Sequence, residues 1–352
     1  MTVIPKEDTT SVQKGAGVFR KKAPAGRRPG KPGRSALTPY LFIGPILLVF
    51  LGFYLWPAFS TVTSSLFTWG MLNPWQINAP ADWEYVGLEN YSSTLTSADF
   101  WNAALNSAIW LVVFPTLVLA VSFPLALLVW NARRGSGIFR SIFILPMTIS
   151  LSAAGIIWSF IYNPDPNKGV LNAFLALFGL EDASFTWGPL ELHAGQWLSN
   201  PGVLHLGSMD LRLANLFVII PAVWAFAGFG VITFTAGLTS VPSELLDAAR
   251  VDGAKQSQLI RHVVIPSLRP SIVVVAVVSV IFALRTFDIV LVTTAGGPAK
   301  DTEVLAMLLW RQVFQYLDTP QGGLAAAIAV LMSVFMIAIS LPYIRATLKE
   351  QQ

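Results

Sequence analysis

Six long apolar stretches constrain the fold of this chain more than any other feature. A helix needs about 20 mostly apolar residues to cross a hydrocarbon core roughly 30 Å thick. The stretches that meet this length lie at about residues 38–59, 107–130, 141–162, 214–238, 271–295 and 323–345. We therefore predict an all-α polytopic membrane protein with six transmembrane helices, whose membrane domain covers residues 38–352.

The composition agrees with a membrane protein and excludes several kinds of site. Hydrophobic residues make up 54% of the chain and charged residues 12%, which is more apolar surface than one soluble core of this length could bury. The absence of cysteine excludes disulfides and cysteine-based metal or redox sites. The three histidines, His193, His205 and His262, are too scattered to indicate a metal site. No group of nucleophile and base suggests an enzyme, so we predict neither a catalytic nor a metal site.

The distribution of Lys and Arg predicts the orientation in the membrane. If the amino terminus is cytoplasmic, the inner segments hold 18 of the 23 Lys and Arg residues, as cytoplasmic loops usually do. Both termini are then cytoplasmic, and the net charge of +4 has a topological cause that needs no nucleic acid. Residues 1–37 are rich in Pro, Gly and charge, so we predict a disordered tail that sets topology and attracts anionic lipid. A regulatory or nucleic-acid-binding role is the alternative for this tail.

The segment ELLDAARVDGAKQSQLIRHVVIP interrupts the apolar runs within the predicted cytoplasmic loop 239–270. Pro242 suits the first turn of a helix, and Glu244 complements the positive end of that helix. Residues three or four positions apart lie on one side of a helix, and here that side carries Leu245, Ala248, Ala249 and Asp252. Gly253 tolerates the left-handed conformation that ends helices, and Pro266 is expected to stop a second helix before the next span. Small alanines allow another backbone to approach, so we predict a knob that enters a groove of a partner protein.

This segment resembles a loop of the permease subunits of bacterial ABC importers, which reads E-A-A-x-x-D-G-A, eight further residues, then I-x-L-P. Here DAARVDGA is followed by eight residues and VVIP. Asp247 stands in place of the Glu, Val263 in place of the Ile and Ile265 in place of the Leu. The resemblance implies that a cytoplasmic ABC ATPase dimer contacts Glu244, Asp247, Ala248, Ala249, Asp252, Gly253, Ala254 and Pro266. Closure of that dimer on ATP would switch two paired permeases between inward-open and outward-open states.

Other segments narrow the resemblance to maltose-type carbohydrate permeases. YVGLENY with FWNAALNS, NKGVLNAFL, and RTFDIVLVTTAGGPAKDTEVLAMLLWRQVF are similar to segments that this family carries in the same order. The resemblance implies sugar import across a bacterial inner membrane, with an extracytoplasmic solute-binding protein and a second, distinct permease. ATP and Mg would be bound by the partner ATPase subunits, since this chain contains no G-x-x-x-x-G-K-[ST] phosphate loop. No cofactor is expected in the chain itself.

The resemblance also places cavity-lining positions on the fourth and fifth predicted spans. They fall on Ala222, Phe226, Phe229, Ser279, Phe282, Ala283 and Thr286. Rings can cover the apolar face of a sugar, while hydroxyls exchange hydrogen bonds with it. Ala283 lacks the amide found there in the maltose permease, which leaves maltose itself, or sugar binding by this subunit, open. Packing between helices is the alternative role for each position.

Arg285 and Asp288 are charged residues within the fifth predicted span, where charges are expensive and usually functional. At positions i and i+3 of a continuous helix they can neutralise each other. On such a helix Asp288 points roughly opposite Ser279 and away from a sugar. We therefore predict a structural or gate-forming ion pair, with direct substrate binding as the alternative.

The predicted outer segment 163–213 combines two features. The stretch NKGVLNAFLALFGL favours a short amphipathic helix, for which we expect a place in the membrane interface. The remainder, with Trp187 and Trp197, is a candidate docking surface for an external partner.

Two alternatives to a sugar importer stay open. The same kind of importer could carry glycerol phosphate or another polar solute. An ion-driven secondary transporter would be expected to show related half-repeats and an intramembrane carboxylate relay. The sequence shows neither, and Asp288 is the single acidic residue well inside a predicted span.

Overall fold

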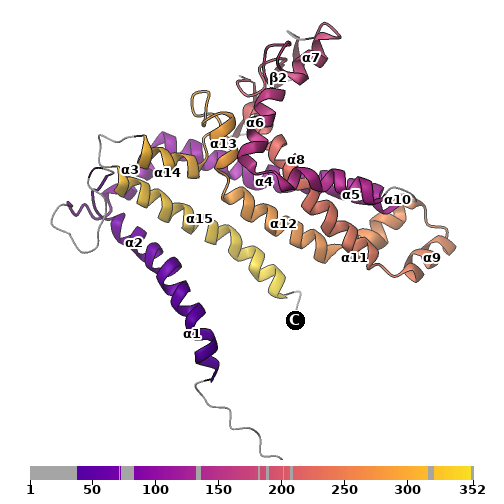
Figure 1. Ribbon diagram of the computed structural model, residues 1–352, viewed down its shortest axis with the longest axis horizontal. Helices are drawn as coiled ribbons and strands as arrows, with labels where there is room; N and C mark the ends of the chain where they lie inside the picture. Colours follow the sequence, from indigo (N-terminus) through magenta and orange to yellow (C-terminus); the bar gives the residue numbers. More distant parts are fainter. Residues whose placement is uncertain are drawn as a thin grey trace, which may run out of the picture. The chain divides into compact units, whose positions relative to one another are not determined.

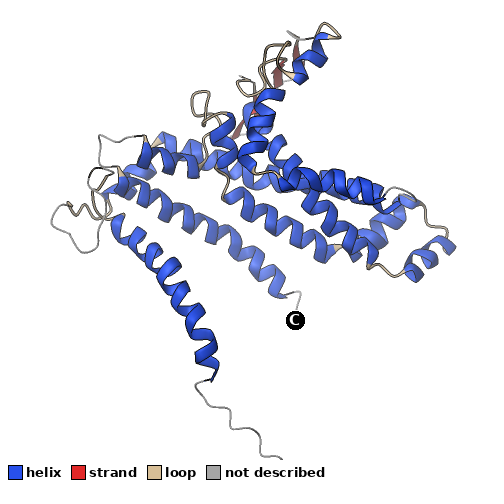
Figure 2. Cartoon of the chain, in the orientation of Figure 1, coloured by secondary structure: helices blue, strands red, loops and turns tan. Residues whose placement is uncertain are grey.

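The computed structural model describes residues 38–70, 72, 83–131, 136–180, 183–187, 190–200, 202–206, 209–315 and 321–349. The predicted tail, residues 1–37, lies outside the described residues. Two compact units divide the chain, Met1–Trp56 and Pro57–Gln352. Helices dominate the described residues, as Figure 2 shows in blue.

The described part of the first unit is a single apolar helix. Helix α1 (Thr38–Phe50) continues into the π-helical turn η1 (Leu51–Leu55) without an intervening loop. The segment contains no acidic or basic side chain near either end of α1, and Pro45 lies inside it. The uniform apolar composition agrees with a helix whose surroundings are lipid or protein.

The second unit contains the remaining elements. Its helices before the outer segment are α2 (Trp56–Ser64), α3 (Glu89–Thr96), α4 (Ala98–Asn131), α5 (Ser136–Ile144), the 3-10 turn η3 (Leu145–Thr148) and α6 (Leu151–Ile161). The outer segment holds α7 (Val170–Ala176), β1 (Ser184–Trp187), β2 (Leu190–His193), β3 (Val203–Leu206) and β4 (Met209–Arg212). The chain ends with α8 (Leu213–Thr239), α9 (Ser243–Val251), α10 (Gln256–Leu259), the π-helical turn η4 (Ile260–Val264), α11 (Ile265–Ser267), α12 (Arg269–Leu284), α13 (Asp288–Thr293), α14 (Leu305–Phe314) and α15 (Gly322–Lys349).

Three helical stretches among the described residues are long and apolar enough to cross a membrane, namely Tyr40–Ser64, Ala98–Asn131 and Leu213–Thr239. Two further stretches qualify as pairs of helices that bend at a break. The count rises to five if each bent pair is taken as one span. The sixth predicted range falls within α15, which runs for 28 residues.

The predicted third span is not one continuous helix. The chain bends by 101° between Gly137–Thr148 and Leu151–Ile161. Pro146 lies in the 3-10 turn η3, and Ser150 caps α6 by accepting a hydrogen bond from the Ala153 N–H at 3.2 Å. A proline that lacks an N–H donor and a serine N-cap together end one helix and begin another.

The core of the second unit forms where α4, α8 and α12 pack side by side (Figure 1). Trp110, Phe114 and Val118 of α4 are buried there, as are Ala222 of α8 and Val275 of α12. Without a strong hydrophobic drive in lipid, such packing depends on close van der Waals contact between helices.

One glycine allows the close approach of α8 to α4. A methyl group at Gly230 would lie 2.4 Å from the Ser122 Oγ and 2.5 Å from the Ser122 Cβ. The same Ser122 hydroxyl donates a hydrogen bond to the Ala227 carbonyl at 3.0 Å. Small residues at an interface of membrane helices permit this separation.

Two short β-hairpins separate α7 from α8 and add strands to a fold predicted to be all-α. Strands β1 and β2 pair antiparallel with Ser184 opposite His193, and β3 and β4 pair with Val203 opposite Arg212. Figure 2 draws them in red. Strand β4 leads directly into α8, since Leu213 follows Arg212 in the chain.

Candidate functional site

The predicted knob is an exposed helix, α9, at the carboxyl end of α8 (Figure 1). Leu246 is buried and attaches the helix to the core, whereas Glu244, Asp247 and Ala248 are exposed. Two apolar side chains of α9 are also exposed, Leu245 at 52% and Val251 at 87%. The half-buried Ala249 also packs against the core, and a helix held in this way beneath an exposed face suits one that a partner protein covers.

Gly253 ends α9 in the predicted way. Its φ angle is +80°, the left-handed region that favours glycine. The Ala254 N–H donates to the Ala249 carbonyl at 3.0 Å, and the Gly253 N–H donates to the Arg250 carbonyl at 3.0 Å. This pair of bonds is the Schellman motif, which satisfies the last carbonyls of the helix and fixes its end.

Pro266 does not stop the second helix of the loop, so that prediction is wrong. The chain stays helical through α10, η4 and α11, and Pro266 lies inside α11. The bend of 68° falls between Gln256–Ser267 and Arg269–Leu284, where Pro270 occupies the first turn of α12. The buried side chains of Leu259, Val264 and Leu268 hold this part of the loop against the core.

The predicted cavity positions divide into buried and ring-forming residues. Ala222, Ser279 and Ala283 are buried, and the Ser279 hydroxyl donates to the Val275 carbonyl of its own helix at 2.7 Å. Phe226 of α8 and Phe282 of α12 meet with ring centroids 5.0 Å apart. Further ring contacts join Phe226 to Phe229 at 5.4 Å, Phe114 to Phe282 at 5.2 Å and Phe114 to Phe226 at 5.6 Å.

A cavity of about 310 Å³ lies beside this aromatic cluster, at the end of α12. Phe282 and Thr286 are the predicted cavity residues that line it. The full lining is Leu151, Val278, Ile281, Phe282, Arg285, Thr286, Phe287, Asp288 and Ile289. Six of these nine residues are apolar and three are polar, and a mostly apolar cavity with a few polar groups is typical of sites for small molecules.

Arg285 and Asp288 do not form the predicted ion pair. Helix α12 ends at Leu284, Arg285 is its C-cap, and α13 begins at Asp288, so the two are not at i and i+3 of one helix. No salt bridge within 4.0 Å involves either side chain in the described segments. Both side chains are exposed and line the same cavity as Phe282, contrary to the direction expected for Asp288 on a continuous helix.

Trp197 is not part of an exposed docking surface. Its side chain is 8% exposed, its Nε1 donates to the Asn172 Oδ1 at 2.9 Å, and its ring stacks on Tyr162 with centroids 6.2 Å apart. The tryptophan therefore joins α7 to the end of α6. The side chain of Trp187 lies outside the described residues.

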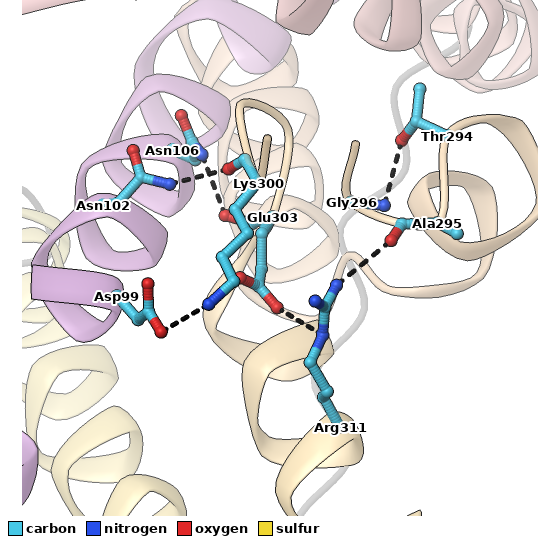
Figure 3. A network of polar contacts seen from close by, with 9 residues as sticks. All are labelled: Asp99, Asn102, Asn106, Thr294, Ala295, Gly296, Lys300, Glu303 and Arg311. Atoms are coloured by element: carbon cyan, nitrogen blue, oxygen red, sulfur yellow. Dashed lines mark hydrogen bonds and ion pairs between the residues drawn. The ribbon is translucent and has the colours of Figure 1, made fainter. Parts of the chain in front are cut away.

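A polar network that no sequence pattern indicated lies at the opposite end of α8 from α9, as Figure 3 shows. Lys300 forms an ion pair with Asp99 and accepts from Asn102 at 2.6 Å through its carbonyl. The Asn106 side chain donates to the Glu303 carbonyl at 2.9 Å. The network therefore ties the amino-terminal turns of α4 to residues 294–303. Scattered asparagines and charges gave no local pattern from which it could have been recognised.

Glu303 is the buried charge at the centre of this network. Its side chain is fully buried, and one carboxylate oxygen lies 3.0 Å from the Arg311 Nε. Burial raises the pKa of Glu303 above its usual range, while the charges of Arg311 and Lys300 oppose that rise. Arg311 also donates to the Ala295 carbonyl at 3.2 Å, which connects α14 to the end of α13.

Comparison with known proteins identifies the family. Residues 119–345 match the family described as the binding-protein-dependent transport system inner membrane component. The chain is 31% identical over 314 residues to a probable ABC transporter permease protein of Pyrococcus horikoshii, covering 85% of this chain and 94% of that protein. It is 26% identical over 313 residues to the trehalose/maltose transport system permease protein MalF of Thermococcus litoralis, covering 89% and 94%.

A solved structure has the same fold. It is the crystal structure of a bacterial ABC transporter involved in the import of the acidic polysaccharide alginate, with a TM-score of 0.66 and 20% identity. The match covers 89% of this chain and 96% of that chain. Residues 119–345 match the family, and the chain is 31% identical to the Pyrococcus horikoshii permease over most of both chains. This chain therefore belongs to the binding-protein-dependent transport system inner membrane components, the permease subunits of ABC transporters.

Proposed function

We propose that this permease forms part of the path by which an ATP-driven, binding-protein-dependent importer carries a sugar, an oligosaccharide or a glycoside. The observation that carries the proposal is helix α9, an exposed helix with one buried anchor and an end fixed by Gly253. Movement of such a helix can be passed to α8 through the short connection 240–242 and to α12 through the segment 252–268, which packs against the core. The permease carries out no chemistry of its own.

The partners follow from this role. A cytoplasmic ATPase dimer binds ATP and Mg and receives α9 through Glu244, Asp247, Ala248, Ala249, Asp252, Gly253, Ala254 and Pro266. A second permease, distinct from this one, completes the path, and a solute-binding protein delivers cargo on the outer side. Both termini of this chain lie in the cytoplasm of a bacterial cell, as the positive-inside pattern indicates. Membrane lipid surrounds the helices.

A sugar is the favoured cargo for two reasons. The permease MalF of Thermococcus litoralis belongs to a trehalose/maltose transport system. In addition, Phe282, whose ring contacts that of Phe226, lines a cavity together with Thr286 and two charged side chains. Rings and hydrogen-bonding groups together suit a carbohydrate. Glycerol phosphate is the alternative cargo of the same kind of importer.

The test is purification of the tagged chain from its native host in mild detergent, with mass spectrometry of the proteins that accompany it. The complex is then reconstituted in proteoliposomes with its binding protein, and uptake of labelled trehalose, maltose, xylose and sn-glycerol 3-phosphate is measured. We expect an ATPase and a second permease to co-purify, and a neutral sugar to accumulate only when ATP is supplied on the ATPase side. If the chain purifies alone and uptake follows an ion gradient, an ion-driven secondary transporter replaces this proposal.

A further inference from the structure

The break between α12 and α13 is the starting point, because it occurs in the middle of an otherwise apolar segment. Helix α12 ends at Leu284 and α13 begins at Asp288, with Phe287 at φ −147° and ψ −58° between them. Irregular backbone at membrane depth is tolerated where it is buried in protein or lines a water-filled cavity. Here residues 285–289 line the cavity of about 310 Å³, which has room for water or a polar molecule.

The two charges at the break suit the helix ends on which they lie. Arg285 is the C-cap of α12, where a positive charge is favourable, and Asp288 is in the first turn of α13, where a negative charge is favourable. This local effect explains how the break tolerates both charges. It does not provide hydrogen-bond partners for the guanidinium and carboxylate groups, since neither side chain has a hydrogen bond or salt bridge to any described residue.

The surroundings of the two charges resemble one side of a binding site. Phe282 and Thr286 line the same cavity, and Phe282 belongs to the aromatic cluster with Phe114 and Phe226. An unpaired charge that faces the bilayer core would cost several kcal/mol, so these side chains need a polar partner or water. The cavity provides space for that partner on the side where the rings lie.

We infer that Arg285 and Asp288 contact the cargo directly and select a neutral, polyhydroxylated molecule. The Asp288 carboxylate accepts hydrogen bonds from cargo hydroxyls, and the Arg285 guanidinium donates to cargo oxygens. The charges of Arg285 and Asp288 cancel, so the pair is complementary to a cargo without net charge. Asp288 would repel a phosphate or a carboxylate. This inference rests on the proposed function and narrows it to neutral sugars over glycerol phosphate.

The test uses the whole complex of permease pair and ATPase, without the binding protein, so that the selectivity of that protein does not enter. Thermal stability of the complex is measured with trehalose, maltose or xylose as neutral probes and with glucuronate or sn-glycerol 3-phosphate as anionic probes. The variants are Asp288→Asn and Arg285→Gln, with Asp288→Glu and Arg285→Lys as charge-preserving partners. The matched controls are Ile337→Val, an exposed apolar residue of α15, and Lys168→Gln, a charge change at a residue that does not line the cavity.

We expect a neutral sugar to stabilise the parent complex and the anionic probes to have little effect. Asp288→Asn and Arg285→Gln should weaken the apparent affinity for that sugar at least about tenfold, as loss of a charged hydrogen bond does. Asp288→Asn should also admit the anionic probes, because it removes the repelling carboxylate and leaves Arg285. The controls and the sugar-free melting temperature should not change, and the charge-preserving variants should retain part of the affinity.

Three results would overturn the inference. The first is that no neutral sugar stabilises the parent, or that the anionic probes do so more strongly. The second is that both variants bind sugar as the parent does. The third is that the variants separate the two permeases on size exclusion and, in proteoliposomes with the binding protein, abolish uptake of every cargo alike, which would assign the charges to the partner permease. If the proposed function itself were wrong, the parent complex would show no ATP-dependent uptake. If this inference alone is wrong, that uptake persists.

Discussion

The Arg311 Nε lies 3.0 Å from a carboxylate oxygen of Glu303, and the Glu303 side chain is fully buried. No described residue gives the carboxylate a hydrogen bond, so the ion pair with this arginine is its main compensation. Removing one partner of a buried ion pair usually costs about 3–5 kcal/mol, because a buried charge is left unpaired. The pair holds α14 against the loop that follows α13.

Arg311→Gln should therefore destabilise the protein strongly at neutral pH and less at acid pH. Burial already raises the pKa of Glu303, and loss of Arg311 removes an opposing influence, so the pKa rises further. The native state then holds its proton more tightly than the unfolded chain does. This tighter binding of the proton by Glu303 stabilises the native state below the ordinary glutamate pKa, and the stabilisation is lost as the pH rises through the raised pKa. Melting temperatures at pH 5 and pH 8 measure this difference.

The control for that experiment is the double variant Glu303→Gln with Arg311→Gln. With no charge left at either position, the pH dependence from this pair should disappear and most of the stability should return. An equal loss for Arg311→Gln at both pH values would show that the buried carboxylate is not the cause.

Gly230→Ala should destabilise the contact of α8 with α4. The new methyl group would lie 2.4 Å from the Ser122 Oγ, and overpacking of this kind typically costs about 1–3 kcal/mol. Gly137→Ala is the matched control, because nothing lies within 4 Å of its new methyl group. Thermal melts of the two variants in detergent should differ clearly. Equal melting temperatures would mean that the helices can separate at Ser122 without cost.

Trp197→Phe should lower stability and leave the affinity for the solute-binding protein unchanged. The substitution removes the hydrogen bond from Nε1 to the Asn172 Oδ1 while keeping a ring against Tyr162. A double-mutant cycle with Asn172→Ala should give a coupling energy near 1 kcal/mol. A normal melting temperature with weaker binding-protein affinity would instead restore Trp197 to a docking surface.

The proposed orientation can be tested cleanly because the chain contains no cysteine. A cysteine introduced at Lys168, whose side chain is 71% exposed, should react with a membrane-impermeant maleimide added outside. A cysteine introduced at Asp252 should react only after the membrane is permeabilised. The reverse pattern would place the termini outside and contradict coupling of α9 to a cytoplasmic ATPase.

The sequence allowed prediction of local features that a few neighbouring residues determine. The end of α9 at Gly253 follows from the conformational freedom of glycine, and the apolar runs at α4 and α8 follow from membrane thickness. The family resemblance rests on residue spacing within one loop, which is also a local property, and it was confirmed.

Features that depend on contacts between distant residues could not be predicted in this way. The break after Leu284 separates Arg285 from Asp288 without a proline or glycine between them, so an ideal helix was the wrong assumption. The bond from Asn215 to Asn106 at 3.0 Å joins helices more than a hundred positions apart in the chain. No pattern in one sequence indicates such a pair.

Binding of the ATPase to Gly253 variants shows whether α9 couples this permease to its ATPase. Gly253→Pro cannot adopt a φ of +80° and loses the N–H that bonds to the Arg250 carbonyl, whereas Gly253→Asn tolerates the left-handed conformation. We predict that the ATPase co-purifies with the parent and with Gly253→Asn but is lost from Gly253→Pro, while the second permease stays bound to all three. If Gly253→Pro retains the ATPase and transports at the parental rate, α9 is not the coupling site and the account is wrong.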